Sequence, residues 1–125
     1  MTADDLNREA PARLRVLFAF GLTPEFYSLD QATILELLAV LKEGYSGLKQ
    51  KFDVDVLGGL DDDELVVGAT SSWPWTAYIL ADAPDYDAVR QVAGLIRTLR
   101  VGEHRMWRYF KVEARIGRPL FFGES

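Results

Sequence analysis

The chain has 125 residues, of which 49% are hydrophobic and 26% charged, and this is the composition of an ordinary globular domain. It contains no cysteine, which excludes disulfides, thiolate nucleophiles and zinc–thiolate sites. A net charge of −5 argues against nucleic acid as a partner, because affinity for a phosphate backbone depends on Lys and Arg. No apolar run approaches the roughly 18 residues of a membrane span, so we expect no membrane partner.

The first residues set the expected organisation of the chain. Residues 1–12 are acidic and polar, lack the apolar core of a secretory signal, and predict a flexible N-terminal tail. Residues 13–125 show no repeat, linker or low-complexity block and predict a single domain. A cytoplasmic location is the default expectation for such a chain.

The first half of the chain predicts a strand, a helix and a hairpin. Residues 13–20 alternate in side-chain character and predict a strand. Ser28 and Gln31 have the spacing of a capping box, and they predict a helix whose apolar positions continue to Leu48. Residues 52–59 predict a second strand, and "LDDDELVVG" (60–68) predicts a turn with a short returning strand.

The second half predicts a strand, a helix and a strand. "WPWTAYILA" (73–81) has the composition of a long strand. Pro84 and Asp85 then mark the start of a helix that ends before Gly102. "RMWRYFKVEARI" (105–116) predicts the final strand.

This order predicts an α+β fold of the ferredoxin-like βαββαβ type, with an antiparallel sheet and two helices on one face. Alternation in the final strand predicts that one side faces the helices and that the other carries Trp107, Tyr109, Lys111, Glu113 and Arg115. That second side is too polar for a dry core and too aromatic for a plain solvated face. By analogy with other domains of this fold, we expect such a face to be covered in a homodimer in which two sheets pack face to face as a dimeric α+β barrel.

The two tryptophans around Pro74 are the first candidates for a binding site. Strand alternation predicts that Trp73 and Trp75 lie on the same side as Ala77. Pro74 cannot donate to a strand ladder, which predicts a position near the end of the sheet. Two interpretations remain open: the indoles pack against a helix or a dimer partner, or they line a pocket for a small aromatic ligand.

Polar candidates for chemistry are few. His104 is the only histidine and therefore a candidate general acid or base, or a ligand to iron or haem. The alternative is that a lone histidine in a loop has no chemical role. Tyr78 and Tyr109 offer phenol hydroxyls. Arg108, Arg115 and Glu113 are candidates for contacts with an acidic or carbonyl-bearing ligand, or for a cross-strand ion pair. Asp61, Asp62 and Asp63 lack the spacing of a calcium loop, so we predict a solvated turn and no metal site.

Several segments together resemble a known family. The segments are "WPWTAYILADAPDYDAV" (73–89) and "RTLRVGEHRMWRYFKVEARIGRPL" (97–120), with "DDDELVVG" (61–68) before them. They are similar to the IacB-like proteins found with genes of indole-3-acetic acid catabolism, and more broadly to the dimeric α+β barrel superfamily, whose members include muconolactone isomerases, cofactor-free monooxygenases and haem-degrading enzymes. The resemblance implies a role in the breakdown of indole-derived or other aromatic compounds, without defined catalytic residues.

Three hypotheses follow from these observations. The first is a small isomerase-like or oxygenase-like enzyme without a cofactor, in which Trp73, Trp75 and Trp107 stack an aromatic acid, Arg108 or Arg115 contacts its carboxylate, and His104 or Tyr78 moves a proton. The second is a non-catalytic binder that uses the same pocket as an accessory protein of the pathway. The third is a haem-handling protein, for which His104 would be the axial ligand.

Overall fold

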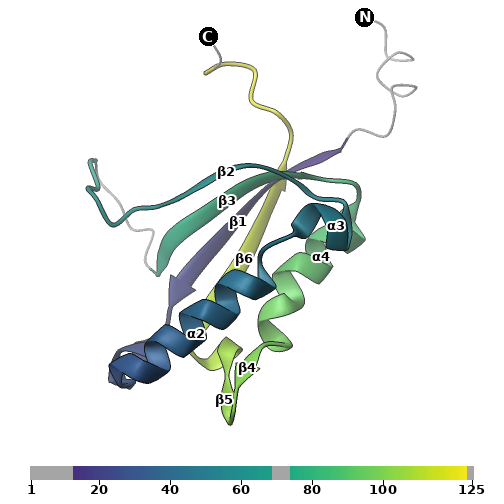
Figure 1. Ribbon diagram of the computed structural model, residues 1–125. Coiled ribbons are helices and arrows are strands. Elements are labelled where there is room, and N and C mark those ends of the chain that lie inside the picture. The colour runs from purple at the N-terminus through teal and green to yellow at the C-terminus, as the bar shows by residue number, and fades with distance from the viewer. Residues whose placement is uncertain (1–12, 69–73, 124–125) are drawn as a thin grey trace, which may run out of the picture.

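The computed structural model describes residues 13–68 and 74–123, and within them it confirms the ferredoxin-like α+β fold (Figure 1). The main sheet has the strand order β2-β3-β1-β6, and all neighbouring strands are antiparallel. Both long helices cover the same face of this sheet. The main elements are β1 (Leu14–Leu22), α2 (Gln31–Gly44), β2 (Asp55–Asp61), β3 (Trp75–Ala83), α4 (Tyr86–Gly94) and β6 (Phe110–Gly117).

Helix α2 starts later and ends earlier than the sequence pattern predicted. Its N-cap is Asp30, whose carboxylate accepts a hydrogen bond from the Thr33 backbone N–H at 3.0 Å, and hydrogen bonds from Thr33 lower the pKa of this carboxyl. Ser28 is not the cap, because its hydroxyl donates to the Glu25 carbonyl in a preceding 3₁₀ turn. After Gly44 the chain turns through Gly47, which has a φ of 63°, into the short helix α3 (Leu48–Phe52).

The predicted returning strand after β2 is wrong. Among the described residues, none from 62 to 68 forms a strand, and Leu65 and Val67 are exposed. Strand β2 pairs with β3 instead, and the backbone N–H of Asp62 donates to the Thr76 carbonyl at 2.8 Å. Apolar side chains alone do not produce a strand when no partner strand and no buried face are available to them.

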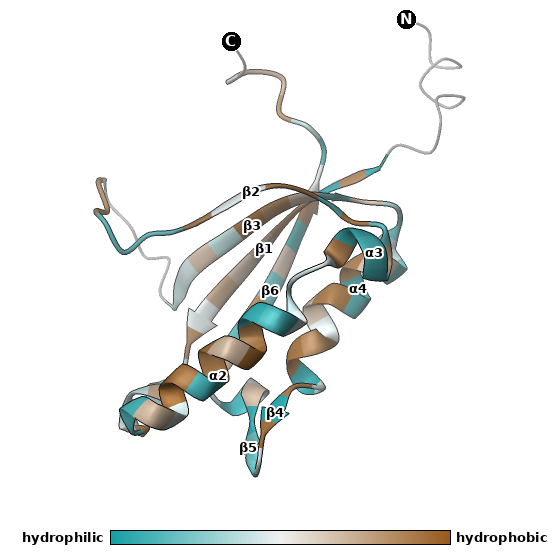
Figure 2. Cartoon of the chain, viewed as in Figure 1, coloured by the Kyte–Doolittle hydropathy of each residue, from teal (hydrophilic) through white to brown (hydrophobic). Residues whose placement is uncertain are grey.

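The helix-facing side of the sheet forms the core. Val16, Phe18 and Phe20 of β1 pack in one cluster with Val89 and Val92 of α4. A second cluster surrounds Leu37 of α2 and includes Met106, Tyr109 and Phe110. Figure 2 shows β1 as a largely apolar central strand beside β6, in which polar and apolar residues alternate. None of the helices within 13–68 and 74–123 combines the length and the apolar character needed to cross a bilayer.

Tyr45, the C-cap of α2, contacts both clusters. Its ring meets that of Phe20 edge to face at 5.0 Å between centroids. Its hydroxyl oxygen is buried and has no hydrogen-bond partner among the described residues. Burial raises the pKa of this phenol well above its usual value, and the nearby backbone of Ile96 opposes the rise only in part.

We therefore expect the Tyr45→Phe variant to lose less stability than the wild-type protein as the pH rises into the alkaline range. Above the usual tyrosine pKa of about 10, this phenol ionises in the unfolded chain and stays neutral in the folded one. The folded state then binds more protons than the unfolded state, so the free energy of unfolding falls as pH rises, by up to about 1.4 kcal/mol for each pH unit. Urea titrations of both proteins at pH 8 and pH 11 measure the difference, and parallel losses in the two proteins would contradict it.

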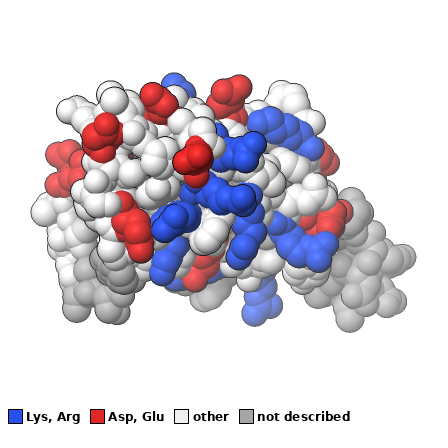
Figure 3. Space-filling view, turned by 90° about the horizontal axis from the view of Figure 1, so that it is seen from below, with Lys and Arg blue, Asp and Glu red and all other residues white. Residues whose placement is uncertain are grey.

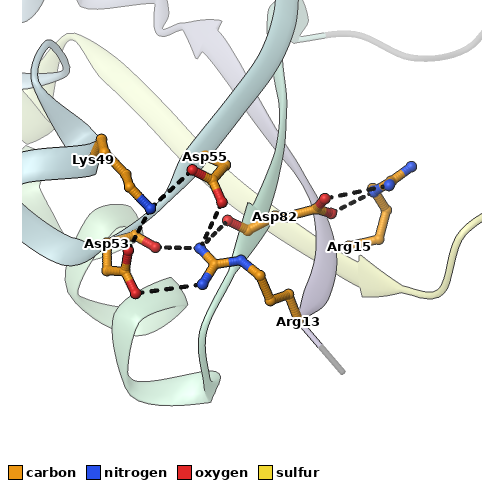
Figure 4. A network of polar contacts seen from close by, with 6 residues as sticks. All are labelled: Arg13, Arg15, Lys49, Asp53, Asp55 and Asp82. Atoms are coloured by element: carbon orange, nitrogen blue, oxygen red, sulfur yellow. Dashed lines mark hydrogen bonds and ion pairs between the residues drawn. The ribbon is translucent and has the colours of Figure 1, made fainter. Parts of the chain in front are cut away.

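A network of charged side chains joins the start of β1 to β2 and β3 at one end of the sheet (Figure 4). Arg13 forms ion pairs with Asp53 and Asp55 and donates to backbone carbonyls of Asp53 and Asp82. Lys49 also contacts both Asp53 and Asp55, at 2.6 and 3.1 Å. The hydrogen bond from Lys49, followed by that from Arg13, lowers the pKa of Asp53. These contacts hold Asp53 in its left-handed conformation, with a φ of 57°, between α3 and β2.

Candidate functional site

The segment before β6 is a turn and not the start of a long strand, which corrects the predicted places of Trp107 and Tyr109. A two-stranded hairpin of β4 (Arg100–Val101) and β5 (His104–Arg105) precedes a 3₁₀ turn over residues 106–108. Met106 is fully buried, and its backbone N–H donates to the Leu99 carbonyl at 3.0 Å. Tyr109 is consequently buried in the core and does not lie on the open face of the sheet, whereas Trp107 is 46% exposed.

Trp75 lies on a different side of its strand from the one predicted. Ala77 pairs with Phe20 and faces the helices, but a bulge in β3 brings Trp75 opposite Gly21. Paired residues of antiparallel strands share a face, so Trp75 turns away from the side that carries Ala77. Trp73 lies outside the described residues.

Trp75 and Trp107 line the same cavity, which has a volume of about 440 Å³ and lies along the β6 edge. We call it the tryptophan cavity. Gly21 lies between Trp75 of β3 and Lys111 of β6 in the paired strands, so no side chain separates them at that position. The residues that line the cavity are Trp75, Ile96, Arg97, Trp107, Phe110, Lys111, Val112 and Glu113.

The charged groups of this cavity differ from those that the sequence suggested. Arg97 and Lys111 line it, are exposed, and form no ion pair among the residues that the structure describes. Glu113 also lines it, and its carboxylate accepts from Arg115 Nε at 2.7 Å. Arg108 and Arg115 do not line it. The ion pair of Arg115 joins it to Glu113 within β6, whereas the sequence predicted a pair across strands.

The two candidates for proton transfer lie away from the tryptophan cavity. Nδ1 of His104 is 2.9 Å from the Tyr109 hydroxyl, in the β4–β5 hairpin region. The Tyr78 hydroxyl donates to the Trp75 carbonyl at 3.2 Å and lies 3.4 Å from a carboxylate oxygen of Asp62. Neither His104 nor Tyr78 lines the cavity, and this arrangement leaves Glu113 as the carboxylate nearest to a ligand held there.

His104, the candidate axial ligand of haem, lines none of the cavities described in this section. The contact between its Nδ1 and the Tyr109 hydroxyl leaves Nε2 as the ring nitrogen that an iron atom would use. In the described part of the chain, no group of three or more His, Asp and Glu side chains is arranged to hold a metal ion. Asp61, Asp62 and Asp63 lie at the end of β2, where the Asp63 N–H donates to Asp61 Oδ1.

A second hollow lies between α2 and β3 and was not suggested by the sequence. It consists of two adjacent volumes of about 490 and 410 Å³ that share Phe20, Leu38, Leu41 and Ala77. Asp61, Asp62 and Asp63 line one end, and Lys42 with Tyr45 line the other. This hollow is mainly apolar. Aromatic rings line it, as they line the tryptophan cavity, but Lys42 is the one cation in its lining among the described residues.

No family model and no curated protein matches this chain. Among solved structures, it is similar to a protein described as a candidate chlorite dismutase, with 18% sequence identity and a TM-score of 0.49. The match covers 94% of this chain and 48% of the other, so this chain spans about half the length of that protein. A likeness at this level concerns the fold alone.

Proposed function

We propose that this domain binds a small aromatic acid in the tryptophan cavity. The observation that carries the proposal is the meeting of two indole side chains with two cations around one cavity. The indoles are those of Trp75 and Trp107, and the cations, Arg97 and Lys111, form no ion pair with another described residue. Indole rings stack on aromatic ligands, and a guanidinium group pairs with a carboxylate. The resemblance of the segments around these residues to IacB-like proteins supports an indole-3-acetic-acid-derived compound as the ligand, within aromatic-compound catabolism.

The geometry favours a binder over a catalyst. His104 and Tyr78 were the candidates for proton transfer, and both lie outside the cavity. Glu113 is the carboxylate in its lining, and this group accepts a hydrogen bond from Arg115. An accessory protein that holds a pathway intermediate requires only the indoles and the cations, so it is the simpler assignment for this site.

Trp107→Ala tests the proposal. We expect the affinity for indole-3-acetate to fall about tenfold, which corresponds to about 1.4 kcal/mol of lost stacking. Trp107→Phe keeps an aromatic surface and is expected to lose less. Because Trp107 is half-exposed and outside the core, both variants should fold normally. Isothermal titration calorimetry measures each affinity.

Tyr86→Ala is the matched control, because Tyr86 is an exposed aromatic side chain on α4 that lines none of these cavities. Unchanged affinity in Trp107→Ala, or an equal loss in Tyr86→Ala, would refute the tryptophan cavity as the binding site. Chromatography of each incubated mixture separates the two functional classes, because a binder returns its ligand unchanged and an enzyme yields a product.

A homodimer is part of this proposal. The face of the sheet opposite the helices carries Leu17, Leu80, Tyr78 and Leu60, which pair across three neighbouring strands. Leu60 and Leu80 are 63% and 38% exposed, so this face leaves apolar side chains in water. A second copy packed sheet to sheet would cover them, as in a dimeric α+β barrel.

A further inference from the structure

Five cations lie in the β4–β5 hairpin and in the segments on either side of it: two are paired in the hairpin, two end the 3₁₀ turns that precede and follow it, and one lies at the start of β6. They are Arg97, Arg100, Arg105, Arg108 and Lys111, and we call them the basic patch. They account for five of the 14 Lys and Arg residues of a chain whose net charge is −5. Figure 3 shows Lys and Arg side chains gathered near the middle of the face seen from below, the side on which β4 and β5 lie in Figure 1.

No side chain of the basic patch forms an ion pair within residues 13–68 and 74–123, although Glu103 lies in the turn of the same hairpin and Glu113 lines the same cavity as Lys111. All five side chains are exposed. By contrast, Arg13, Arg15, Arg90 and Arg115 elsewhere in the fold each have an acidic partner. The cations of the patch therefore remain available to an external anion.

Two of these cations are held close together by the hairpin itself. Arg100 pairs directly with Arg105 in the antiparallel β4–β5 ladder, and Gly102, with a φ of 57°, supports the tight turn between the strands. Like charges at directly opposed positions repel each other and destabilise the pair. An anion bound between the two arginines would relieve this repulsion, which favours a ligand at this position.

The basic patch is continuous with the tryptophan cavity. Arg97 and Lys111 belong to both, and Trp107 lies in the sequence between Arg105 and Arg108. One carboxylate can engage one or two cations, so an aromatic acid alone leaves most of the patch unused. A phosphate chain carries several charges in a compact group, and arginine binds phosphate oxygens in a bidentate manner.

We propose that the ligand of this site is an aromatic acyl group joined to a phosphate-bearing carrier, such as a coenzyme A thioester, with its phosphates on the basic patch. This inference rests on the proposed function, because it assigns the aromatic part to the tryptophan cavity. Outside the basic patch the chain carries more acidic than basic residues, and this negative charge disfavours binding of a long nucleic-acid backbone. A few phosphates, by contrast, fit a patch of this size.

The double variant Arg100→Gln/Arg105→Gln tests the inference, because it removes hairpin charges and leaves the cavity lining unchanged. We expect the wild-type protein to bind indole-3-acetyl-coenzyme A at least about tenfold more tightly than indole-3-acetate at about 50 mM salt, and to lose this advantage at about 500 mM. The double variant should lose the same advantage while its affinity for indole-3-acetate stays within about twofold. Arg90→Gln, which removes an exposed, ion-paired arginine of α4, should change neither affinity.

The outcomes separate this inference from the proposed function. Equal affinities of the wild-type protein for the thioester and the free acid, or an unchanged thioester affinity in the double variant, would overturn the inference and leave the proposed function standing. A third outcome is that the wild-type protein binds sodium pyrophosphate but not indole-3-acetate, and that the double variant no longer binds pyrophosphate. This outcome would support the phosphate site and overturn the proposed function. Tighter binding of a single-stranded oligonucleotide, increasing with its length, would overturn the inference in favour of nucleic acid.

Discussion

Replacing Gly21 by alanine is expected to destabilise the protein and to impair the tryptophan cavity together. A Cβ atom on Gly21 would lie 2.5 Å from the carbonyl oxygen and 2.9 Å from the carbonyl carbon of Pro74. These are backbone atoms, so the clash is relieved only by moving the start of β3, which carries Trp75. We expect a loss of roughly 1–3 kcal/mol in the free energy of unfolding, as for other overpacked sites.

Gly58→Ala is the matched control for this prediction. Gly58 belongs to β2 of the same sheet, and a Cβ atom there would meet nothing within 4 Å. We expect it to leave both stability and ligand affinity nearly unchanged, whereas Gly21→Ala should also weaken the binding of indole-3-acetate through the displaced Trp75. Urea denaturation and calorimetric titration measure the two effects. Similar behaviour of the two variants would show that the Pro74 backbone does not constrain Trp75.

The fold could be predicted because each main element has its own hydrophobic period. Val16, Phe18 and Phe20 alternate along β1 and all face the helices, as the strand pattern indicated. Leu37 repeats at helical spacing and is fully buried on α2. Once the order of strands and helices is known, the short connections and the antiparallel pairing leave few other arrangements.

The errors in the prediction arise where local hydrogen bonds override this alternation. The bulge in β3 near Thr76 reverses the side on which Trp75 lies, and a one-residue irregularity leaves no mark in the hydrophobic pattern. Thr23 holds the chain before β6 in a turn, since its hydroxyl donates to the Arg108 carbonyl at 2.7 Å and its N–H donates to the Tyr109 carbonyl. These contacts span 85 residues or more, so no local pattern could indicate them.

The sequence indicated some residues of the tryptophan cavity and not others. Trp75, Trp107 and Glu113 were chosen from the sequence and line one cavity, although the face assignment that led to Trp107 was wrong. Arg97 was missed because it follows α4 in a 3₁₀ turn, where helical alternation no longer indicates direction. Lys111 was placed on the open face but was not recognised as a ligand contact, because its position beside Trp75 depends on the bulge.

Leu80→Arg is expected to convert a dimer into a monomer. Leu80 pairs with Leu17 of β1 and with Gly58 of β2 on the sheet face opposite the described helices, and its side chain is 38% exposed. If a second sheet packs there, a buried guanidinium group in each subunit would lack a partner and would cost several kcal/mol, roughly the scale of an unpaired buried charge. In a monomer the same arginine would extend into water, so the fold itself should persist.

Leu35→Arg provides the control, because Leu35 is a 59% exposed residue of α2 on the helix side of the sheet. Size-exclusion chromatography with light scattering should give the dimer mass for the wild-type protein and for Leu35→Arg, and the monomer mass for Leu80→Arg, with circular dichroism reporting an unchanged fold. A monomeric wild-type protein would refute the sheet-to-sheet dimer. A dimeric Leu80→Arg protein would place the subunit contact on another face, and the tryptophan cavity, formed within one chain, would then stand without the barrel.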